Sequence, residues 1–194
     1  MASLYFYYSS MNAGKSIDLL RSNYNYLERG MKTLVLKPAI DTREETAVVR
    51  SRIGLEVECD LFKPDDNLWW VVNRALGITN QIHCIFIDEA QFLTPEQVNQ
   101  LGRITNELDI PVLCYGLRTD FQGNLFPGSA KLLGIADKLT ELKTICWCGS
   151  KATMVLRMDE DGNVVRDGAQ VQVGGNDTYV SVCRKHHADG RGHC

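Results

Sequence analysis

The chain lacks an apolar run long enough to cross a bilayer, and it lacks an excess of positive charge. Its 194 residues contain no stretch of 18 consecutive apolar residues, about the length that a membrane-spanning helix needs. Lysine and arginine (21) are outnumbered by aspartate and glutamate (24), which gives a formal net charge of −3. Such a charge provides no general attraction for nucleic acid or for an anionic membrane. We therefore expect a protein that binds neither.

The start of the chain lacks the basic region with which a secretory signal begins. It leads directly into the apolar and aromatic segment Leu4–Tyr8, so we expect a cytoplasmic protein, in which thiols stay reduced. The seven cysteines then indicate metal ligands or buried thiols rather than disulfides. Cys84 and Cys114 lie inside apolar runs and are expected to pack in the core.

A phosphate-binding loop with serine in place of its first glycine follows this segment. It reads Ser9-Ser10-Met11-Asn12-Ala13-Gly14-Lys15-Ser16. The segment before it predicts a buried strand, and apolar residues at helical spacing continue as far as Leu27. At such a strand-to-helix turn the backbone N–H groups can face phosphate oxygens, Lys15 can reach the terminal phosphates and Ser16 can hold Mg²⁺. The motif therefore predicts a nucleotide site.

Two acidic residues at the end of a later strand complete the predicted phosphate site. The apolar run at residues 83–87 ends in Asp88 and Glu89. Asp88 is placed to hold Mg²⁺ beside Ser16, directly or through water. Because side chains alternate along a strand, Glu89 points elsewhere and can either accept a proton from a nucleophile or orient a water molecule.

Strand-like and helical segments alternate up to about residue 144. We expect strands at 4–8, 33–37, 83–88, 111–116 and about 138–144, and helices following residue 16 and over 68–76, 95–108 and 130–135. The helix over 95–108 opens with Thr94-Pro95-Glu96-Gln97, a capping box with proline at the first helical position. Alternation of this kind predicts an α/β fold, with a mainly parallel sheet and crossover helices on both faces.

Four metal-ligand side chains appear where the composition changes, near residue 145. Cys146 and Cys148 lie 35 or so residues before Cys183 and His186, and these four can enclose a tetrahedral Zn²⁺ with no open position, so the metal is expected to be structural. One residue separates the first pair where two are common. His187 is a competing ligand, and two unrelated cysteine pairs are the alternative interpretation.

Five motifs together resemble the thymidine kinase family, of the cellular zinc-containing type found in bacteria and animals. They are Met11-Asn12-Ala13-Gly14-Lys15-Ser16, Asp41-Thr42-Arg43, Phe86-Ile87-Asp88-Glu89-Ala90-Gln91, Tyr115-Gly116-Leu117-Arg118-Thr119-Asp120-Phe121 and Gly174-Gly175-Asn176-Asp177-Thr178-Tyr179-Val180-Ser181-Val182-Cys183. The resemblance covers about residues 3–186. It implies transfer of the γ-phosphate of ATP to the 5′-hydroxyl of thymidine, with deoxyuridine as an alternative acceptor, for the salvage of pyrimidine nucleotides.

The resemblance also implies roles for single residues. Glu89 matches the general base, Asp88 supports the metal, and Asp41, Arg43 and Gln91 match ATP-contacting positions. Phe121, Tyr179 and the loop Gln170-Val171-Gln172-Val173-Gly174 match the nucleoside site, where a lasso-like loop holds the base largely through its backbone. Cys146, Cys148, Cys183 and His186 match zinc ligands that anchor this loop. The family also implies a homotetramer and feedback inhibition by dTTP.

The resulting architecture is a phosphate-loop nucleotide-binding α/β domain at 1–144, a small zinc-binding β module with the lasso loop at 145–187, and a flexible tail at 188–194. Arg43 and Arg118 are candidates for neutralising phosphate charge. Two other functions remain open. One is a nucleotide hydrolase that drives a switch or motor, in which Glu89 polarises water. The other is a zinc-containing nucleic-acid binder, against which the acidic charge balance argues.

Overall fold

A six-stranded sheet forms the centre of the computed structural model, which describes residues 1–39, 47–170 and 178–193. Its strands lie in the order β5-β2-β6-β7-β1-β8, and each neighbouring pair is parallel. They are β1 (Leu4–Ser9), β2 (Thr33–Pro38), β5 (Asp60–Phe62), β6 (Cys84–Ile87), β7 (Val112–Leu117) and β8 (Lys138–Glu141). The parallel sheet confirms the predicted α/β fold.

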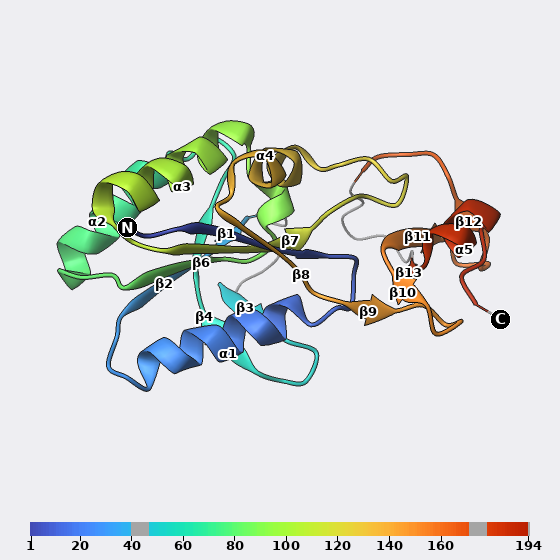
Figure 1. Ribbon diagram of the computed structural model, residues 1–194, viewed down its shortest axis with the longest axis horizontal. Helices are drawn as coiled ribbons and strands as arrows, with labels where there is room; N and C mark the ends of the chain where they lie inside the picture. The colour runs from blue at the N-terminus through green and yellow to red at the C-terminus, as the bar shows by residue number, and fades with distance from the viewer. Residues whose placement is uncertain (40–46, 171–177, 194) are drawn as a thin grey trace.

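Helices cover both faces of this sheet (Figure 1). One face carries α2 (Leu68–Thr79), α3 (Pro95–Leu108) and α4 (Pro127–Ile135), and the other carries α1 (Lys15–Leu27). Residues of β6 alternate between two buried clusters, so that Ile85 and Ile87 pack with α3 while Phe86 packs with Leu19 of α1. A strand covered on both faces has to be apolar throughout, which is why β6 was visible in the sequence.

Helix α3 begins as its sequence predicts. The Gln97 N–H donates to Thr94 Oγ1 and the Thr94 N–H donates to Gln97 Oε1, both at 3.1 Å. This reciprocal pair satisfies two backbone donors that the first turn of a helix leaves without partners. The observed boundaries of α3 therefore match the predicted ones.

Three short strands between β2 and α2 were not predicted. The strands β3 (Val48–Arg50) and β4 (Glu56–Glu58) form an antiparallel hairpin, and β5 joins the edge of the large sheet. Each has only three residues, too few to establish an apolar period in the sequence. The hairpin contributes to the site described below.

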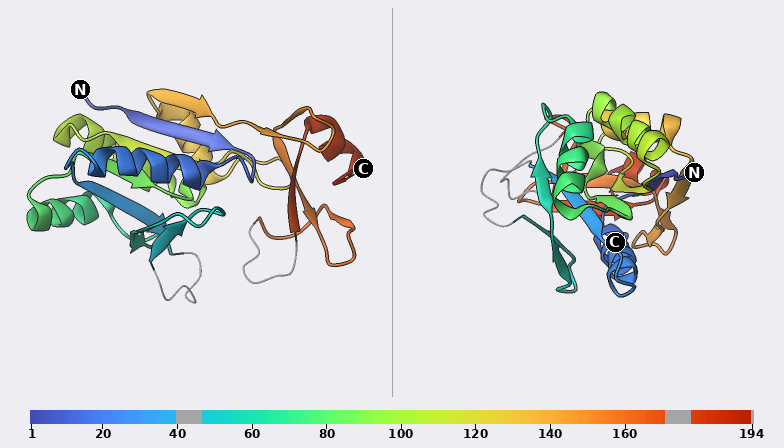
Figure 2. Two further views of the ribbon diagram at one scale, coloured as in Figure 1. Left: turned by 90° about the horizontal axis from the view of Figure 1, so that it is seen from below. Right: turned by 90° about the vertical axis from the view of Figure 1, so that its left-hand side faces the viewer.

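A small antiparallel module lies beyond the carboxyl end of β1 (Figure 2). In it β11 (Met154–Met158) pairs with β12 (Val164–Val165) and β13 (Thr178–Val182), while β9 (Thr144–Ile145) pairs with β10 (Lys151–Ala152). Helix α5 (Arg184–Asp189) follows β13, and it ends two residues beyond the predicted limit of the module. The Arg191 carbonyl after it accepts a hydrogen bond from Trp147 Nε1 at 3.2 Å.

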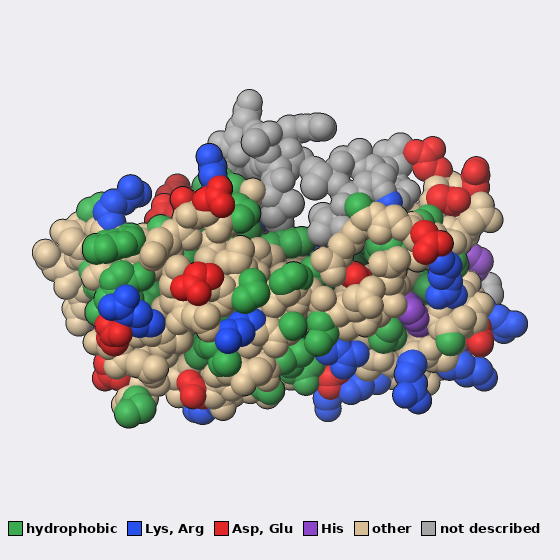
Figure 3. Space-filling view, turned by 90° about the horizontal axis from the view of Figure 1, so that it is seen from above, with side chains coloured by type: hydrophobic (Ala, Val, Ile, Leu, Met, Phe, Trp, Pro, Cys, Tyr) green, Lys and Arg blue, Asp and Glu red, His purple; other side chains and the backbone are tan. Residues whose placement is uncertain are grey.

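The surface over the large sheet carries both signs of charge. Figure 3 shows basic and acidic side chains interspersed over this part of the molecule. Among the described residues, no helix combines the length and the apolar character required to span a bilayer.

Candidate active site

The phosphate-binding loop joins β1 to α1 through two residues with left-handed backbone angles. Gly14, directly before α1, has φ 79° and ψ 20°, a conformation that glycine adopts without steric cost. Asn12 has φ 60°, which asparagine tolerates better than most residues. The Asp18 N–H donates to the Gly14 carbonyl at 2.9 Å and closes the first turn of α1. The loop thereby presents a helix N-terminus, which favours a bound anion.

Ser9, the residue that replaces the usual glycine, is a hydrogen-bond partner of the motif lysine. Lys15 Nζ donates to Ser9 Oγ and to the Ser10 carbonyl, both at 3.1 Å. Ser9 Oγ donates to the same carbonyl at 2.7 Å. Burial lowers the pKa of Lys15, while the charges of Glu89 and Asp88 act in the opposite direction. Phosphate oxygens next to this ammonium would likewise favour its charged form.

A cavity of about 450 Å³ lies over the loop. It is lined by Met11, Asn12, Ala13, Gly14, Lys15, Ser16, Ile17, Arg50, Ser51, Arg52, Glu89 and Leu117. The carboxyl ends of parallel strands are where open α/β sheets bind their ligands. The cavity thus brings Glu89 to the same space as the phosphate-binding loop, as predicted.

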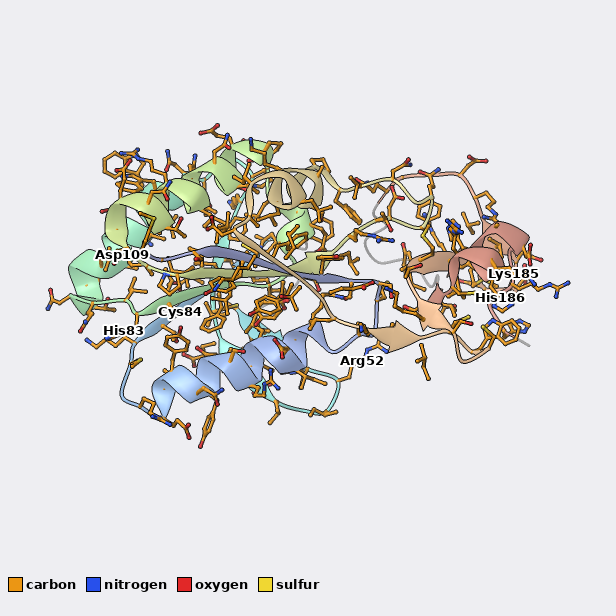
Figure 4. The ribbon with its side chains drawn as sticks, in the orientation of Figure 1. Arg52, His83, Cys84, Asp109, Lys185 and His186 are labelled. Carbon is orange, nitrogen blue, oxygen red and sulfur yellow. The ribbon has the colours of Figure 1, made fainter. Side chains whose placement is uncertain are left out.

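Arg50, Ser51 and Arg52 belong to this cavity although the sequence interpretation did not select them. They lie at the end of β3 and in the turn that follows it. Arg52 lies near the N-terminal end of α1 (Figure 4), whereas the Arg50 guanidinium pairs with Glu56 at 2.8 Å. The available sequence signal was a pair of arginines next to a glycine turn, Arg50-Ser51-Arg52-Ile53-Gly54.

Asp88 follows β6 as a buried carboxylate. Its exposed fraction is 5%, and its Oδ1 atom is a buried side-chain atom without a hydrogen-bond partner among the described residues. Burial, and next the charge of Glu89, raise the pKa of Asp88 to about 7. A buried oxygen left without a donor is costly, and it suits a divalent cation that prefers oxygen ligands.

Glu89 points into the cavity because the backbone turns at this residue. Its φ of 50° and ψ of 40° are left-handed, and β6 has already ended at Ile87. The separation of Glu89 from Asp88 was therefore predicted correctly, but its cause is the turn and not the alternation of a continuing strand. Gln91, predicted to contact ATP, is 1% exposed and does not line the cavity described above.

The described residues of the predicted nucleoside site meet where the large sheet joins the module. Phe121 is 3% exposed, and its ring centre lies 5.3 Å from the guanidinium carbon of Arg157. Tyr179 lies opposite Arg157 in the β11–β13 ladder. Gln170 Nε2 donates to Asp120 Oδ2 at 2.9 Å, next to Phe121 in the chain. The other predicted site residues, Asp41, Arg43, Val171, Gln172, Val173 and Gly174, lie outside the described residues.

Hydrogen bonds connect the module to the phosphate-binding loop. Ser181 Oγ of β13 donates to the Met11 carbonyl at 2.6 Å, and Thr144 Oγ1 of β9 donates to the Asn12 carbonyl at 3.4 Å. Arg118, a predicted partner of phosphate, instead donates from Nη2 to a backbone carbonyl of the module at 3.1 Å. The module therefore contacts the nucleotide loop itself, an arrangement that the sequence did not indicate.

The four predicted zinc ligands converge in the module. One ligand atom from each of Cys146, Cys148, Cys183 and His186 lies within 4.8 Å of the others. His186 Nδ1 is 3.3 Å from Cys146 Sγ and 3.5 Å from Cys183 Sγ, close to the roughly 3.5–3.8 Å between ligand atoms of a tetrahedral zinc site. The cluster can therefore hold a metal ion, in spite of the single residue between the first two cysteines.

Helix α5 decides between the two neighbouring histidines. His186 joins the cluster at the end of the molecule opposite Asp109 (Figure 4), and the Trp147 ring stacks on it with centres 4.1 Å apart. His187 Nε2 instead lies 2.8 Å from the Phe121 carbonyl oxygen. The competing ligand thus contacts the predicted nucleoside site.

Fold and loop together define a nucleotide-binding protein of the phosphate-loop α/β class. A solved structure of an ATPase domain has a similar fold, with a TM-score of 0.52 at 13% identity over 95% of this chain and 82% of that one. The profile of the thymidine kinase family matches residues 2–187. The chain belongs to the thymidine kinase family and is a kinase, as the motifs predicted.

Relatives from bacteria match almost the whole chain. The thymidine kinase of Rhodopirellula baltica is 63% identical over 186 residues, which are 96% of this chain and 88% of the relative. That of Ruegeria pomeroyi is 56% identical over 192 residues, 99% of this chain and 96% of the relative. The similarity therefore includes both the large sheet and the module.

Proposed function

We propose that the protein transfers the γ-phosphate of ATP to the 5′-hydroxyl of thymidine and yields dTMP for nucleotide salvage. The observation that carries this proposal is one cavity in a thymidine kinase family member that holds Lys15, Ser16 and Glu89 together. Phosphoryl transfer requires chiefly positioning and charge neutralisation. The N-terminus of α1, Lys15 and the hairpin arginines provide both for a triphosphate.

The Ser16 hydroxyl and the Asp88 carboxylate are the proposed protein ligands of the Mg²⁺ ion that accompanies ATP. The Asp88 Oδ1 atom, buried without a donor, fits this purpose, and so does the hard oxygen character of both ligands. When bound, the ion neutralises charge on the β- and γ-phosphates.

Glu89 takes the proton of the attacking hydroxyl. Glu89 and the loop line the same cavity, so a nucleoside hydroxyl placed in this cavity can lose its proton to Glu89 as it approaches the γ-phosphate. Lys15 Nζ donates hydrogen bonds to Ser9 and Ser10 in this structure. In the complex with ATP it can contact the phosphates that the loop binds instead.

The nucleoside binds where the large sheet meets the module. Phe121 and Tyr179 supply apolar surface, and the loop from Gln170 to Gly174 reads the base through its backbone. Backbone groups that pair with O4 and N3–H of thymine would meet the wrong pattern in cytosine, which rejects it by about 10²-fold or more. Deoxyuridine keeps the thymine pattern and is the expected second substrate.

Zn²⁺ is the proposed occupant of the cysteine and histidine cluster. Three sulfurs and one nitrogen leave no position for a substrate, so the ion supplies structure and no chemistry. We further propose a cytoplasmic homotetramer with dTTP as feedback inhibitor, on the strength of the family motifs. Hydrolysis of nucleotide to drive a switch or motor is not favoured, since the similarity to an ATPase domain is at 13% identity and concerns the fold alone.

The Glu89→Gln variant tests the proposed reaction. Its kcat should fall by about 10²–10⁴-fold, with ATP binding nearly unchanged, because the amide keeps the shape but cannot accept the proton. Glu96→Gln, at the exposed start of α3, is the control and should behave as wild type. ADP release by the wild type should depend on thymidine. Equal ADP release without nucleoside, or a Glu89→Gln variant that keeps most of its activity, contradicts the proposal.

A further inference from the structure

We propose that Gln91 is a positioning residue for Glu89: it holds one carboxylate oxygen of the base so that the other faces the nucleoside hydroxyl. The inference rests on the proposed role of Glu89. It gives Gln91 a task that does not require its side chain to touch ATP.

Both ends of the Gln91 amide are bonded inside the protein. Gln91 lies in the 3₁₀ turn η1 (Ala90–Phe92) that follows Glu89, and its Nε2 donates to Glu89 Oε2. Its Oε1 accepts the N–H of Leu117, the last residue of β7, at 2.9 Å. The side chain thus connects the base to the neighbouring central strand.

The backbone of Leu117 fixes which way the amide points. An N–H group can only donate, so the atom of Gln91 that faces it has to be the oxygen. The NH₂ group then has to face Glu89, where it donates to a carboxylate. A glutamate side chain has three rotatable bonds, and a donor that is itself held in place restricts them before the substrate arrives.

Two glycines let the surrounding elements hold the turn tightly. A Cβ atom at Gly116 of β7 would lie 2.9 Å from the backbone nitrogen of Gln91 and 3.0 Å from the side-chain Oε1 of Gln91. A Cβ atom at Gly128 of α4 would lie 2.9 Å from the Gln91 carbonyl oxygen. A Cβ atom does not fit at such distances. The strand β7 and the helix α4 can therefore approach the turn η1 this closely only because both positions are glycine. Gln91 is therefore fixed by backbone on both sides.

The experiment compares Gln91→Met with Gln97→Met. Both glutamines are 1% exposed, and Gln97 also bonds at both amide ends, to Thr94 and to backbone carbonyls such as that of Lys63. Methionine fills a similar volume without either bond, so both variants should lose similar thermal stability. Only Gln91→Met should lose kcat, by about 10–100-fold, with the KM values for ATP and thymidine changed by less than about threefold.

A double-mutant cycle separates positioning from general damage. If Gln91 acts through the Glu89 carboxylate, Gln91→Met should cost less than about twofold further in kcat when introduced into Glu89→Gln. Gln91→Leu, which has neither an acceptor for Leu117 nor a donor for Glu89, should show the same low kcat as Gln91→Met and serves if the methionine variant does not fold.

The outcomes distinguish this inference from the proposed function. A wild-type kcat in Gln91→Met or Gln91→Leu, an equal loss of kcat in Gln97→Met, or additive losses in the double variant would overturn it. A Glu89→Gln variant with full activity would instead refute the base itself. If Glu89→Gln is inactive while the Gln91 variants keep wild-type kcat, the positioning role of Gln91 is refuted and the proposed function stands.

Discussion

Replacing Asp88 by asparagine should stabilise the folded protein in buffer without Mg²⁺. The folded state raises the pKa of Asp88 from 3.8 to about 7, first by burial and then by the charge of Glu89. The folded state therefore binds the proton more tightly than the unfolded chain does, and ionisation of Asp88 opposes folding as pH rises from about 4 to 7. Below this window the carboxyl is protonated in both states and the penalty is absent.

The shift of about three pKa units is equivalent to about 4 kcal/mol of free energy of unfolding above pH 7, and to about 2 kcal/mol at pH 5. An asparagine at this position leaves a buried amide short of partners, at a cost of about 1–2 kcal/mol. Asp88→Asn should therefore be about 2–3 kcal/mol more stable than wild type at pH 8 and nearly equal to it at pH 5.

Urea unfolding at the two pH values measures this difference. Asp120→Asn is the contrasting control, because Asp120 is 4% exposed but accepts hydrogen bonds from Gln122, Asn124 and Gln170 at 2.8–2.9 Å; this variant should lose stability. Mg²⁺ with ATP should stabilise wild type more than Asp88→Asn. An Asp88→Asn protein less stable than wild type at pH 8, or a gain that does not shrink at pH 5, refutes the view that ionisation of the buried Asp88 opposes folding.

Five further variants, in three experiments, test other parts of the site. Cys183→Ala should lose bound zinc in metal analysis. It should also raise the KM for both ATP and thymidine, since Ser181, two residues earlier, donates a hydrogen bond to the phosphate-binding loop. Ser181→Ala, which keeps all four metal-binding side chains, should raise the KM for ATP alone. An unchanged KM for ATP in both variants would contradict this link. Phe121→Ala should weaken all accepted nucleosides by about tenfold through lost apolar contact, and competition assays that show altered base choice would argue against it. Arg52→Ala should raise the KM for ATP by about 3–10-fold, more than Arg50→Ala, whose guanidinium pairs with Glu56; equal effects in steady-state assays would remove the special role of Arg52.

The sequence determined those features whose causes are local. The loop from Ser9 to Ser16 could be recognised because its residues serve one strand-to-helix turn, and α3 could be bounded because Thr94 and Gln97 cap it within four residues. The strand β6 was visible because burial on both faces requires an uninterrupted apolar run. The order of five motifs was sufficient to predict the family to which the chain belongs.

Tertiary structure alone decided which distant groups meet. The hairpin β3–β4 brings Arg52 to the cavity, the backbone of Leu117 orients Gln91, and α5 brings His187 to the Phe121 carbonyl. Nothing in the neighbouring residues specifies these contacts, because each depends on how strands pack side by side and on the directions in which buried donors find acceptors. The sequence by itself thus determined the kind of chemistry, and the packing of segments far apart in the chain decided the geometry that supports it.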